Sequence, residues 1–253
     1  MLSKSQISFI QSLQQKKFRR EHGLFLVEGL KSVTEFLNSG YQVEAVYHTP
    51  LIASKMLKLS QKINFEEISL NILEKISTLK TPQDALALVH IPQSPNLNYN
   101  NFRNKFTLVL DGVQDPGNMG TIIRTADWFG ITDIICSEDT VEAYNPKVVQ
   151  ATMGSLSRVN VHYVDLVETV PQLKLPVFGT LLEGENIYDV PFGSEGLLVM
   201  GNEGNGIRPE IKAIINKAIT ISGSGSTESL NVAIATAICC SEIQRNKILA
   251  GNK

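Results

Sequence analysis

The sequence predicts an α/β protein with a parallel sheet in its C-terminal part and a smaller α/β domain before it. Three observations predict this class. From residue 106 onward, short apolar segments alternate with segments of helical periodicity, which is typical of parallel sheets with helices on both faces. The first part of the chain alternates in the same way over a shorter length. Between them lies a segment rich in Pro, Asn and Ser, PQSPNLNYNNFRNK at 92–105.

These observations divide the chain into an N-terminal domain at 1–92, a linker at 93–105 and a C-terminal domain at 106–253. A long surface loop inside a single domain is the alternative to a linker. In the N-terminal domain, apolar spacing predicts a helix around Ile7, Ile10 and Leu13 and further helices at 30–37, 51–61 and 69–76. Short apolar runs predict strands at 24–27, 43–47 and 85–91.

The C-terminal domain has six apolar segments of strand length, at 108–110, 133–136, 159–164, 177–181, 197–200 and 218–221. In parallel sheets of this kind, ligands bind at the loops beyond the carboxyl ends of the strands. The chemically unusual residues of this sequence fall in such loops. We therefore expect a functional site there.

Composition excludes several classes of protein. Hydrophobic residues make up 43%, enough for a packed core, and the net charge of −2 lacks the excess of a basic nucleic-acid protein. Cys136, Cys239 and Cys240 form no C-x-x-C pair, so neither disulfides nor a zinc site are expected. There is no signal-peptide pattern and no run of 18 apolar residues, which favours a cytoplasmic protein without a membrane span.

The first candidate loop follows the strand at 108–110 and reads DGVQDPGNMGTIIRTADWFG at 111–130. Residues 115–117 have turn chemistry, and Asn118 is expected to cap the helix that follows. Arg124 lies off the apolar stripe of that helix and should point away from the core. Each residue also has an ordinary explanation, as a helix cap and as a surface arginine.

The second candidate loop follows the strand at 197–200 within GLLVMGNEGNGIRPE at 196–210. Its glycines, Gly201, Gly204 and Gly206, permit close approach of a ligand to the backbone. The order is neither the dinucleotide fingerprint G-x-G-x-x-G nor a P-loop. Glu203 would repel a phosphate and suits a positively charged ligand or a hydrogen-bond donor, unless it is simply a solvated carboxylate.

The third candidate loop follows the strand at 218–221 within AITISGSGSTESLNVAIATAICC at 218–240. A helix should begin near Ser229, with Asn231 in its first turn or at its edge. A helix start of this kind can present Ser229, Asn231 and free backbone N–H groups to a ligand. Ordinary capping is the alternative.

Together and in this order, the three segments resemble motifs 1, 2 and 3 of the SpoU/TrmH branch of the SPOUT RNA methyltransferases. The matching segments are NMGTIIRTA at 118–126, LVMGNEGNGI at 198–207 and SLNVAIA at 229–235. NPKVVQATMGSLSRVNV at 145–161 is similar to the family's connecting region. FLVEGLKSVTEFL at 25–37 is similar, more weakly, to the family's small substrate-binding domain, which is related to RNA-binding ribosomal proteins.

The resemblance implies transfer of a methyl group from S-adenosylmethionine to a ribose 2′-hydroxyl of structured RNA, without a metal. It also implies a deep trefoil knot in the C-terminal domain and a homodimer with active sites at the subunit interface. Ribosomal RNA is favoured over tRNA, because an added N-terminal domain in this family often accompanies ribosomal RNA; DNA is not expected as a partner.

The resemblance assigns Arg124 as the catalytic residue. A guanidinium is a poor base, so we expect Arg124 to act together with the RNA phosphate. The residues expected to hold the reacting groups are Asn118, Glu203, Ser229 and Asn231. Those expected to contact the donor, largely through the backbone, are Gly201, Ile221 and Leu230, with Thr180 as a further member.

One departure from the family lies in motif 3, where Pro-Met usually follows the isoleucine. Here Ile221 is followed by Ser222 and Gly223, in the loop that lines the donor pocket of the family. A non-catalytic RNA-binding assembly factor on the same fold is therefore one rival hypothesis. The other, a Rossmann-type enzyme with a nucleotide cofactor, lacks its fingerprint.

Contact with RNA is expected at a basic cluster interleaved with Phe18, which consists of Lys16, Lys17, Arg19 and Arg20. A solvated helix end is the alternative. Second candidates for RNA contact are Arg103, Lys105, Lys147 and Arg158.

Overall fold

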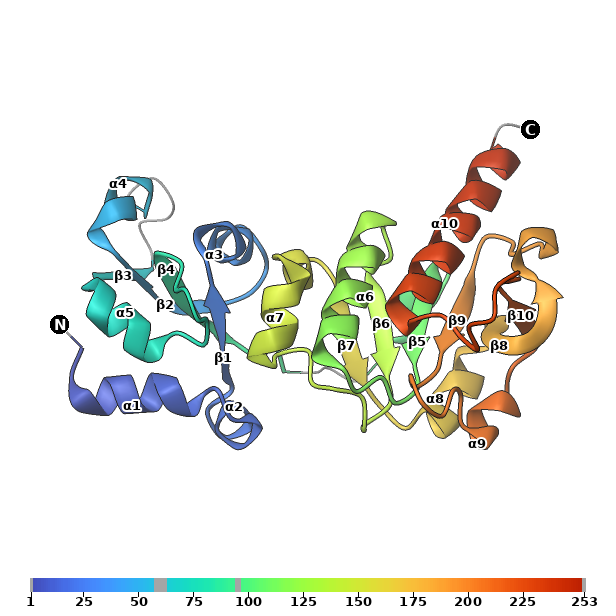
Figure 1. The fold of residues 1–253 in the computed structure, drawn as a ribbon, viewed down its shortest axis with the longest axis horizontal. Coiled ribbons are helices and arrows are strands. Elements are labelled where there is room, and N and C mark those ends of the chain that lie inside the picture. Colours follow the sequence, from blue (N-terminus) through green and yellow to red (C-terminus); the bar gives the residue numbers. More distant parts are fainter. Residues whose placement is uncertain (1, 57–62, 94–96, 252–253) are drawn as a thin grey trace. The chain divides into compact units, whose positions relative to one another are not determined.

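The computed structural model describes residues 2–56, 63–93 and 97–251. Contacts divide the chain into two compact units (Figure 1), each with its own sheet. The N-terminal unit comprises Met1–Gln93 and Glu142–Ser157, and the C-terminal unit comprises Ser94–Val141 and Arg158–Lys253. The contacts thus place residues 142–157, which were expected in the C-terminal domain, in the N-terminal unit. The division of function between residues 1–92 and 106–253 stays a prediction.

The N-terminal unit contains a four-stranded sheet in the order β1-β4-β2-β3. Its strands are β1 (Leu24–Glu28), β2 (Val43–His48), β3 (Asn64–Glu67) and β4 (Ala85–His90). β4 is antiparallel to both β1 and β2, whereas β3 runs parallel to β2 at the edge. The expected strands at 24–27, 43–47 and 85–91 are confirmed to within a residue. β3 was not predicted, because its sequence NFEE has no apolar alternation.

Helices pack beside this sheet. Before residue 93 they are α1 (Lys4–Ser12), α2 (Lys16–His22), α3 (Leu30–Leu37), a 3-10 turn (Pro50–Ile52), α4 (Ala53–Met56) and α5 (Leu70–Ile76). The helix expected at 51–61 is thus a turn followed by α4, and its remainder at 57–61 lies outside the described residues. Ile10, Leu13, Leu73 and Leu86 belong to the buried core.

Residues 142–157 join the N-terminal unit through one helix and its flanks. That helix, α7 (Pro146–Thr152), packs against β1 and is followed by a 3-10 turn (Ser155–Ser157). The ring centroids of Tyr144 and Phe25 are 4.7 Å apart. Gly154 has a φ of +96° and approaches Glu35 so closely that a Cβ would lie 2.8 Å from its Cγ. Sequence spacing does not reveal such a contact between segments more than 100 positions apart.

The C-terminal unit contains a parallel sheet in the order β10-β8-β9-β5-β6-β7. Its strands are β5 (Phe106–Leu110), β6 (Asp133–Cys136), β7 (Asn160–Tyr163), β8 (Val177–Asn186), β9 (Gly196–Met200) and β10 (Lys217–Thr220). The expected parallel sheet is therefore confirmed. β5, β6 and β9 are buried along their whole length, as their nearly continuous apolar sequences indicate.

The helices of this unit are α6 (Pro116–Trp128), α8 (Leu166–Leu173), α9 (Pro209–Lys212) and α10 (Val232–Gly251), with 3-10 turns at Tyr99–Phe102 and Ile187–Asp189. α6 and α10 lie side by side in Figure 1 and pack together. Of the expected linker, residues 94–96 lie outside the described residues, while Phe102 is 1% exposed in the core of this unit. No described helix is long and apolar enough to cross a membrane.

Candidate functional site

The candidate site is formed by three loops of the C-terminal unit. Residues 111–115 connect β5 to α6, residues 201–208 connect β9 to α9, and residues 221–231 connect β10 to α10. All three loops leave the carboxyl ends of parallel strands, and β5 and β9 are neighbours in the sheet. These are the loops in which the sequence placed the candidate residues.

The start of α6 differs from the expected one. Asp115, and not Asn118, is the N-cap: its carboxylate Oδ1 accepts a 2.8 Å hydrogen bond from the backbone N–H of Asn118. Pro116 occupies the first helical position, where its missing N–H costs nothing. The expectation that Asn118 caps the helix was therefore wrong. The consequence matters, because the side chain of Asn118 is left available for other partners.

The side chain of Asn118 links the other two loops. Its Nδ2 donates to the Oε1 of Glu203 at 3.0 Å, and its Oδ1 accepts from the Nδ2 of Asn231 at 2.9 Å. Asn118 in the first turn of α6 thus joins one residue from each of the two other loops into one hydrogen-bonded chain. These two bonds define the orientation of the Asn118 amide. The carboxylate of Glu203 can only accept, so it faces the amide nitrogen, and the amide nitrogen of Asn231 can only donate, so it faces the amide oxygen.

Asn231 also holds the start of α10. Its Oδ1 accepts from the backbone N–H groups of Ala233 and Ile234 at 2.9 and 3.3 Å. Asn231 is therefore the residue immediately before the helix, at the edge that the sequence indicated. The Asn231 side chain thus uses its oxygen to cap α10 and its nitrogen to bond Asn118. The position of the start of α10 therefore also sets the geometry of the site.

The other two residues with expected catalytic roles, Arg124 and Ser229, have no hydrogen-bond or ion-pair partner among the described residues. The Arg124 guanidinium, on the exposed side of α6, makes no hydrogen bond or ion pair with any described residue. Its expected position off the apolar stripe is confirmed. Ser229 is exposed in the loop before α10 and also forms no hydrogen bond within the described chain. Both side chains are available to a ligand.

The 201–208 loop folds back on itself. The backbone groups of Asn202 and Gly206 exchange two hydrogen bonds of 3.0 Å. Gly206 has a φ of +67°, and a Cβ on Gly201 would lie 2.3 Å from the carbonyl carbon of Gly206. Gly201 therefore leaves no room for a side chain, and the positive φ of Gly206 favours glycine there. Three polar residues that hold this loop were not predicted from the sequence: Asp111, Asn202 and Arg208. Asp111 could have been found, because a charged residue directly after a buried strand is a visible signal in the sequence.

The residues expected to contact the donor lie along β8 and the two following loops. Thr180 donates its hydroxyl to the Val199 carbonyl at 3.0 Å, at the end of β9. Ile221 directly follows β10 and is half-buried, while Leu230 is exposed. In the described chain, residues 222–230 make no hydrogen bond to the rest of the molecule. A loop whose backbone groups form no such bonds fits a ligand held mainly through the main chain.

The buried thiols have no apparent use as nucleophiles. Burial raises the pKa of Cys240 to about 12 and raises the pKa values of Cys136 and Cys239 as well, so the reactive thiolate is disfavoured. Across residues 2–56, 63–93 and 97–251, no group of three or more His, Cys, Asp or Glu side chains could hold a metal ion.

The expected RNA-binding cluster needs one correction. Lys16, Lys17 and Arg20 are exposed on α2, but Arg19 is 2% exposed. Its guanidinium donates to the carbonyls of Leu13 and Gln14 and pairs with Glu142 at 2.6 Å. Arg19 is therefore committed to the interior of the N-terminal unit and cannot reach an RNA phosphate.

The second candidates for RNA contact are mostly paired with acids. Arg103 lies 3.6 Å from Glu195, Lys105 is 2.7 Å from Asp133, and Arg158 is 2.7 Å from Asp127. Lys147 alone among the four is exposed without such a partner in the described chain.

Comparison with known proteins identifies the family. Residues 105–241 match the model of the SpoU rRNA Methylase family, and residues 4–87 match that of the MRM3-like substrate binding domain. This chain belongs to the SpoU rRNA methylase family. The family match spans all three loops of the site, and the second match falls within the N-terminal unit.

Relatives agree over nearly the whole chain. The chain is 31% identical over 233 residues to the 23S rRNA (guanosine(2553)-2′-O)-methyltransferase RlmP of Bacillus subtilis, covering 89% of this chain and 90% of that protein. A structure of a TrmH-family protein from Porphyromonas gingivalis is 41% identical, with a TM-score of 0.87 over 97% of this chain and 99% of that one. The AdoMet-bound rRNA methyltransferase of Sinorhizobium meliloti is 28% identical, with a TM-score of 0.85 over 97% of both chains. The α/β fold is that of the SpoU/TrmH SPOUT methyltransferases.

Proposed function

We propose that this SpoU-family protein methylates a ribose 2′-hydroxyl of ribosomal RNA with S-adenosylmethionine as the donor. The observation that carries the proposal is the hydrogen-bonded chain from Asn231 through Asn118 to Glu203, on the same loops and helix as an unpaired Arg124. Each residue alone had an ordinary explanation as a cap or surface group. Helix capping alone does not explain why Asn231, Asn118 and Glu203 are hydrogen-bonded to one another at the carboxyl ends of parallel strands.

The donor supplies an electrophilic methyl group, and the protein must position the hydroxyl and ease the departure of its proton. Positioning of reactants can contribute roughly 7–11 kcal/mol of the barrier in favourable cases. Arg124 is exposed and pairs with no residue in the described part of the chain, so its guanidinium is available to hold an RNA phosphate and orient the neighbouring ribose. Because a guanidinium is a poor base, the role of Arg124 is orientation and charge stabilisation, with the proton accepted by the phosphate.

The remaining residues would keep the reaction geometry fixed. Asn118, Glu203 and Asn231 constrain one another, while Ser229 offers a free hydroxyl beside them. Backbone groups at Gly201, Ile221 and Leu230 would hold the donor, together with Thr180 on β8, whose hydroxyl bonds the Val199 carbonyl of β9. Ser222 and Gly223 stand where the family usually has Pro-Met, in the loop without internal hydrogen bonds.

The two units would divide the work. We assign RNA capture to residues 1–92, methyl transfer to residues 106–253, and a connecting role to residues 93–105. The exposed Lys16, Lys17 and Arg20 on α2 provide positive charge for the phosphate backbone. The match to an MRM3-like substrate binding domain supports this division. Since ribosomal RNA is the proposed substrate, the cytoplasm is the proposed location.

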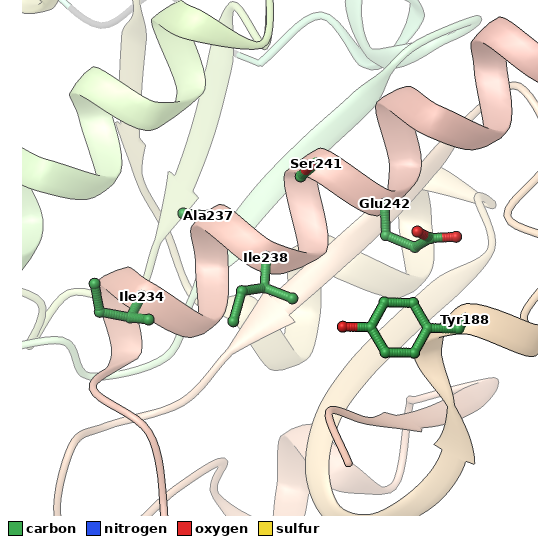
Figure 2. Close-up of a pocket in the computed structure, with 6 residues that line it drawn as sticks. All are labelled: Tyr188, Ile234, Ala237, Ile238, Ser241 and Glu242. Atoms are coloured by element: carbon green, nitrogen blue, oxygen red, sulfur yellow. The ribbon is translucent and has the colours of Figure 1, made fainter. Parts of the chain in front are cut away.

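A homodimer is part of the proposal, and α10 supports it. The first nine residues of α10, VAIATAICC at 232–240, are apolar or small on every face, and a helical segment of this kind is normally buried on every side. Ile234 on α10 is nevertheless 52% exposed, and Tyr188 opposite is 55% exposed. Figure 2 shows Tyr188 facing this helix across an open hollow, which is lined by Tyr188, Ile234, Ala237, Ile238, Ser241 and Glu242. A second copy would cover this apolar surface, and the trefoil knot expected from the family belongs to the same proposal.

Two measurements test the function. S-adenosylmethionine should raise the melting temperature, whereas NAD and ATP should not, because only a ligand that binds the folded state stabilises it. Labelled methyl transfer should then appear in ribosomal RNA and be mapped to a 2′-O position. Donor binding without transfer to any RNA would favour a non-catalytic assembly factor, and transfer to tRNA alone would contradict the proposed substrate.

A further inference from the structure

The buried carboxylate of Asp111 has no role in the chemistry described so far. It follows β5 directly, and its side chain has no exposed surface. A buried ionised carboxylate is costly unless it is paired and hydrogen-bonded. Its retention at the base of the site therefore requires partners that satisfy it.

Arg208 supplies those partners from the loop after β9. Its backbone N–H donates to Oδ2 of Asp111 at 2.7 Å, and its Nε donates to Oδ1 at 2.7 Å. A terminal guanidinium nitrogen lies 2.7 Å from the same Oδ1. Three contacts thus fix the end of the 201–208 loop against the carboxyl end of β5, in the multidentate geometry that arginine allows.

Asn202 ties down the beginning of the same loop. Its Nδ2 donates to the carbonyl of Gly112, the residue after Asp111, at 2.6 Å. Its Oδ1 accepts from the backbone N–H groups of Gly204 and Asn205 at 2.9 and 3.0 Å. Glu203 lies between the two fixed ends, and among the residues that the structure describes only Asn118 hydrogen-bonds its carboxylate. The position of Glu203 therefore depends on how firmly Asp111 and Gly112 hold the loop.

We propose that Asp111 is a positioning residue, which acts through Arg208 to fix the 201–208 loop and with it the donor surface at Gly201 and the carboxylate of Glu203. This inference rests on the proposed methyltransferase function. Displacement of a reacting group by about 1 Å can cost on the order of 100-fold in rate, so a loosened loop should be visible in catalysis.

The test uses the full chain with Asp111→Asn, Arg208→Ala and Arg208→Lys. Asp111→Asn keeps the shape of the side chain but removes one acceptor and the charge. Arg208→Ala and Asp111→Asn should each raise the Kd for S-adenosylmethionine and lower kcat/KM by about 10- to 100-fold. Arg208→Lys keeps the backbone contact and one charged contact, and should recover part of the loss.

Asp133→Asn is the matched control, because Asp133 is also a buried, ion-paired carboxylate of the same unit, at the amino end of β6. It should lower stability without changing the donor Kd. The proposal is overturned if the folded Arg208→Ala and Asp111→Asn proteins have a donor Kd and a kcat/KM within about twofold of the wild-type values. If Asp111→Asn fails to fold, Arg208→Ala still tests the proposal, because Arg208 is partly exposed.

Amide hydrogen exchange at residues 201–207 gives a readout that needs neither donor nor RNA. Faster exchange there in the Asp111 and Arg208 variants, but not in Asp133→Asn, supports the positioning role. Unchanged exchange contradicts it. A wild-type protein that binds no donor would instead overturn the proposed function, so the two failures are distinguishable.

Discussion

Asn231 and Asn118, which are 113 positions apart in the sequence, share a hydrogen bond of 2.9 Å between Nδ2 and Oδ1. Asn118 passes the link on to Glu203 through its own Nδ2. A single amide therefore connects the start of α10 to the glycine loop after β9. Its two bonds are compatible with only one orientation of the Asn118 amide.

Asn231→Asp should separate helix capping from catalysis. Aspartate still accepts from the N–H groups of Ala233 and Ile234, so the melting temperature should stay close to that of the wild type. It cannot donate to Asn118, and either orientation of the Asn118 amide then loses one of its two bonds. Methyl transfer should fall by about 10- to 100-fold. Asn231→Ala, which also removes the cap, should lose about 1 kcal/mol of unfolding free energy as well. Wild-type rates in Asn231→Asp would argue against the chain.

Arg124→Ala should abolish methyl transfer with little effect on folding. Because the side chain is exposed and unpaired, the unfolding free energy should change by less than about 0.5 kcal/mol. Donor binding, measured by calorimetry, should be retained. Arg124→Lys keeps the charge but not the planar fork and should be only partly active. Turnover near the wild-type rate in Arg124→Ala would remove this residue from the mechanism.

Substitution of Lys16, Lys17 and Arg20 by alanine should weaken RNA binding and reduce its salt dependence. Removal of three phosphate contacts lowers the slope of log K against log salt by about 2–3. The matched control removes three exposed lysines elsewhere on the same unit, Lys4, Lys55 and Lys75. Equal effects of the two triple variants on filter binding would mean that net charge, and not this helix, sets RNA affinity.

Arg19→Ala should behave differently from its neighbours. It leaves Glu142 without its partner and removes two hydrogen bonds to backbone carbonyls inside the N-terminal unit. Breaking a buried pair in this way costs about 3–5 kcal/mol, which urea unfolding will detect. An RNA-binding defect without loss of stability would show that Arg19 contacts RNA after all.

Ile234→Glu should convert a dimer into a monomer. Ile234 lies on the exposed apolar face of α10, where a carboxylate would have to be buried in the proposed interface. Sedimentation at micromolar concentration measures the change. Leu51→Glu, at a 79% exposed leucine of the N-terminal unit, is the matched control and should stay dimeric. A wild-type protein that is monomeric while active would contradict the dimer.

Acid should destabilise the protein through Asp133. Burial works to raise the pKa of Asp133, but hydrogen bonds from His162, Lys105 and Thr132 outweigh it and hold this pKa well below its usual range. A lowered folded-state pKa contributes stability above the unfolded value of about 4, which is lost as pH falls toward the folded pKa. Urea unfolding at pH 7 and pH 3 should show part of this loss, about 1 kcal/mol from this group. Asp133→Asn should flatten that part of the profile, and an unchanged profile would exclude the effect.

The sequence alone determined the parallel sheet, the positions of most strands and the three loops that carry the site. It could do so because apolar runs of strand length and glycine-rich or Ser/Gly loops are local signals, and strand–helix alternation restricts the topology. The position of Arg124 off the apolar stripe followed from helical geometry for the same reason.

Only the tertiary structure decided which polar residues pair. Asp115 displaced Asn118 as the N-cap, Arg19 became an interior ion-pair partner of Glu142, and Asp111 was joined to Arg208 across 97 positions. These outcomes depend on long-range contacts, and a polar side chain is satisfied by whichever partner the fold brings within hydrogen-bond distance. Residue type and spacing restrict where such a side chain lies, but only packing determines what it touches.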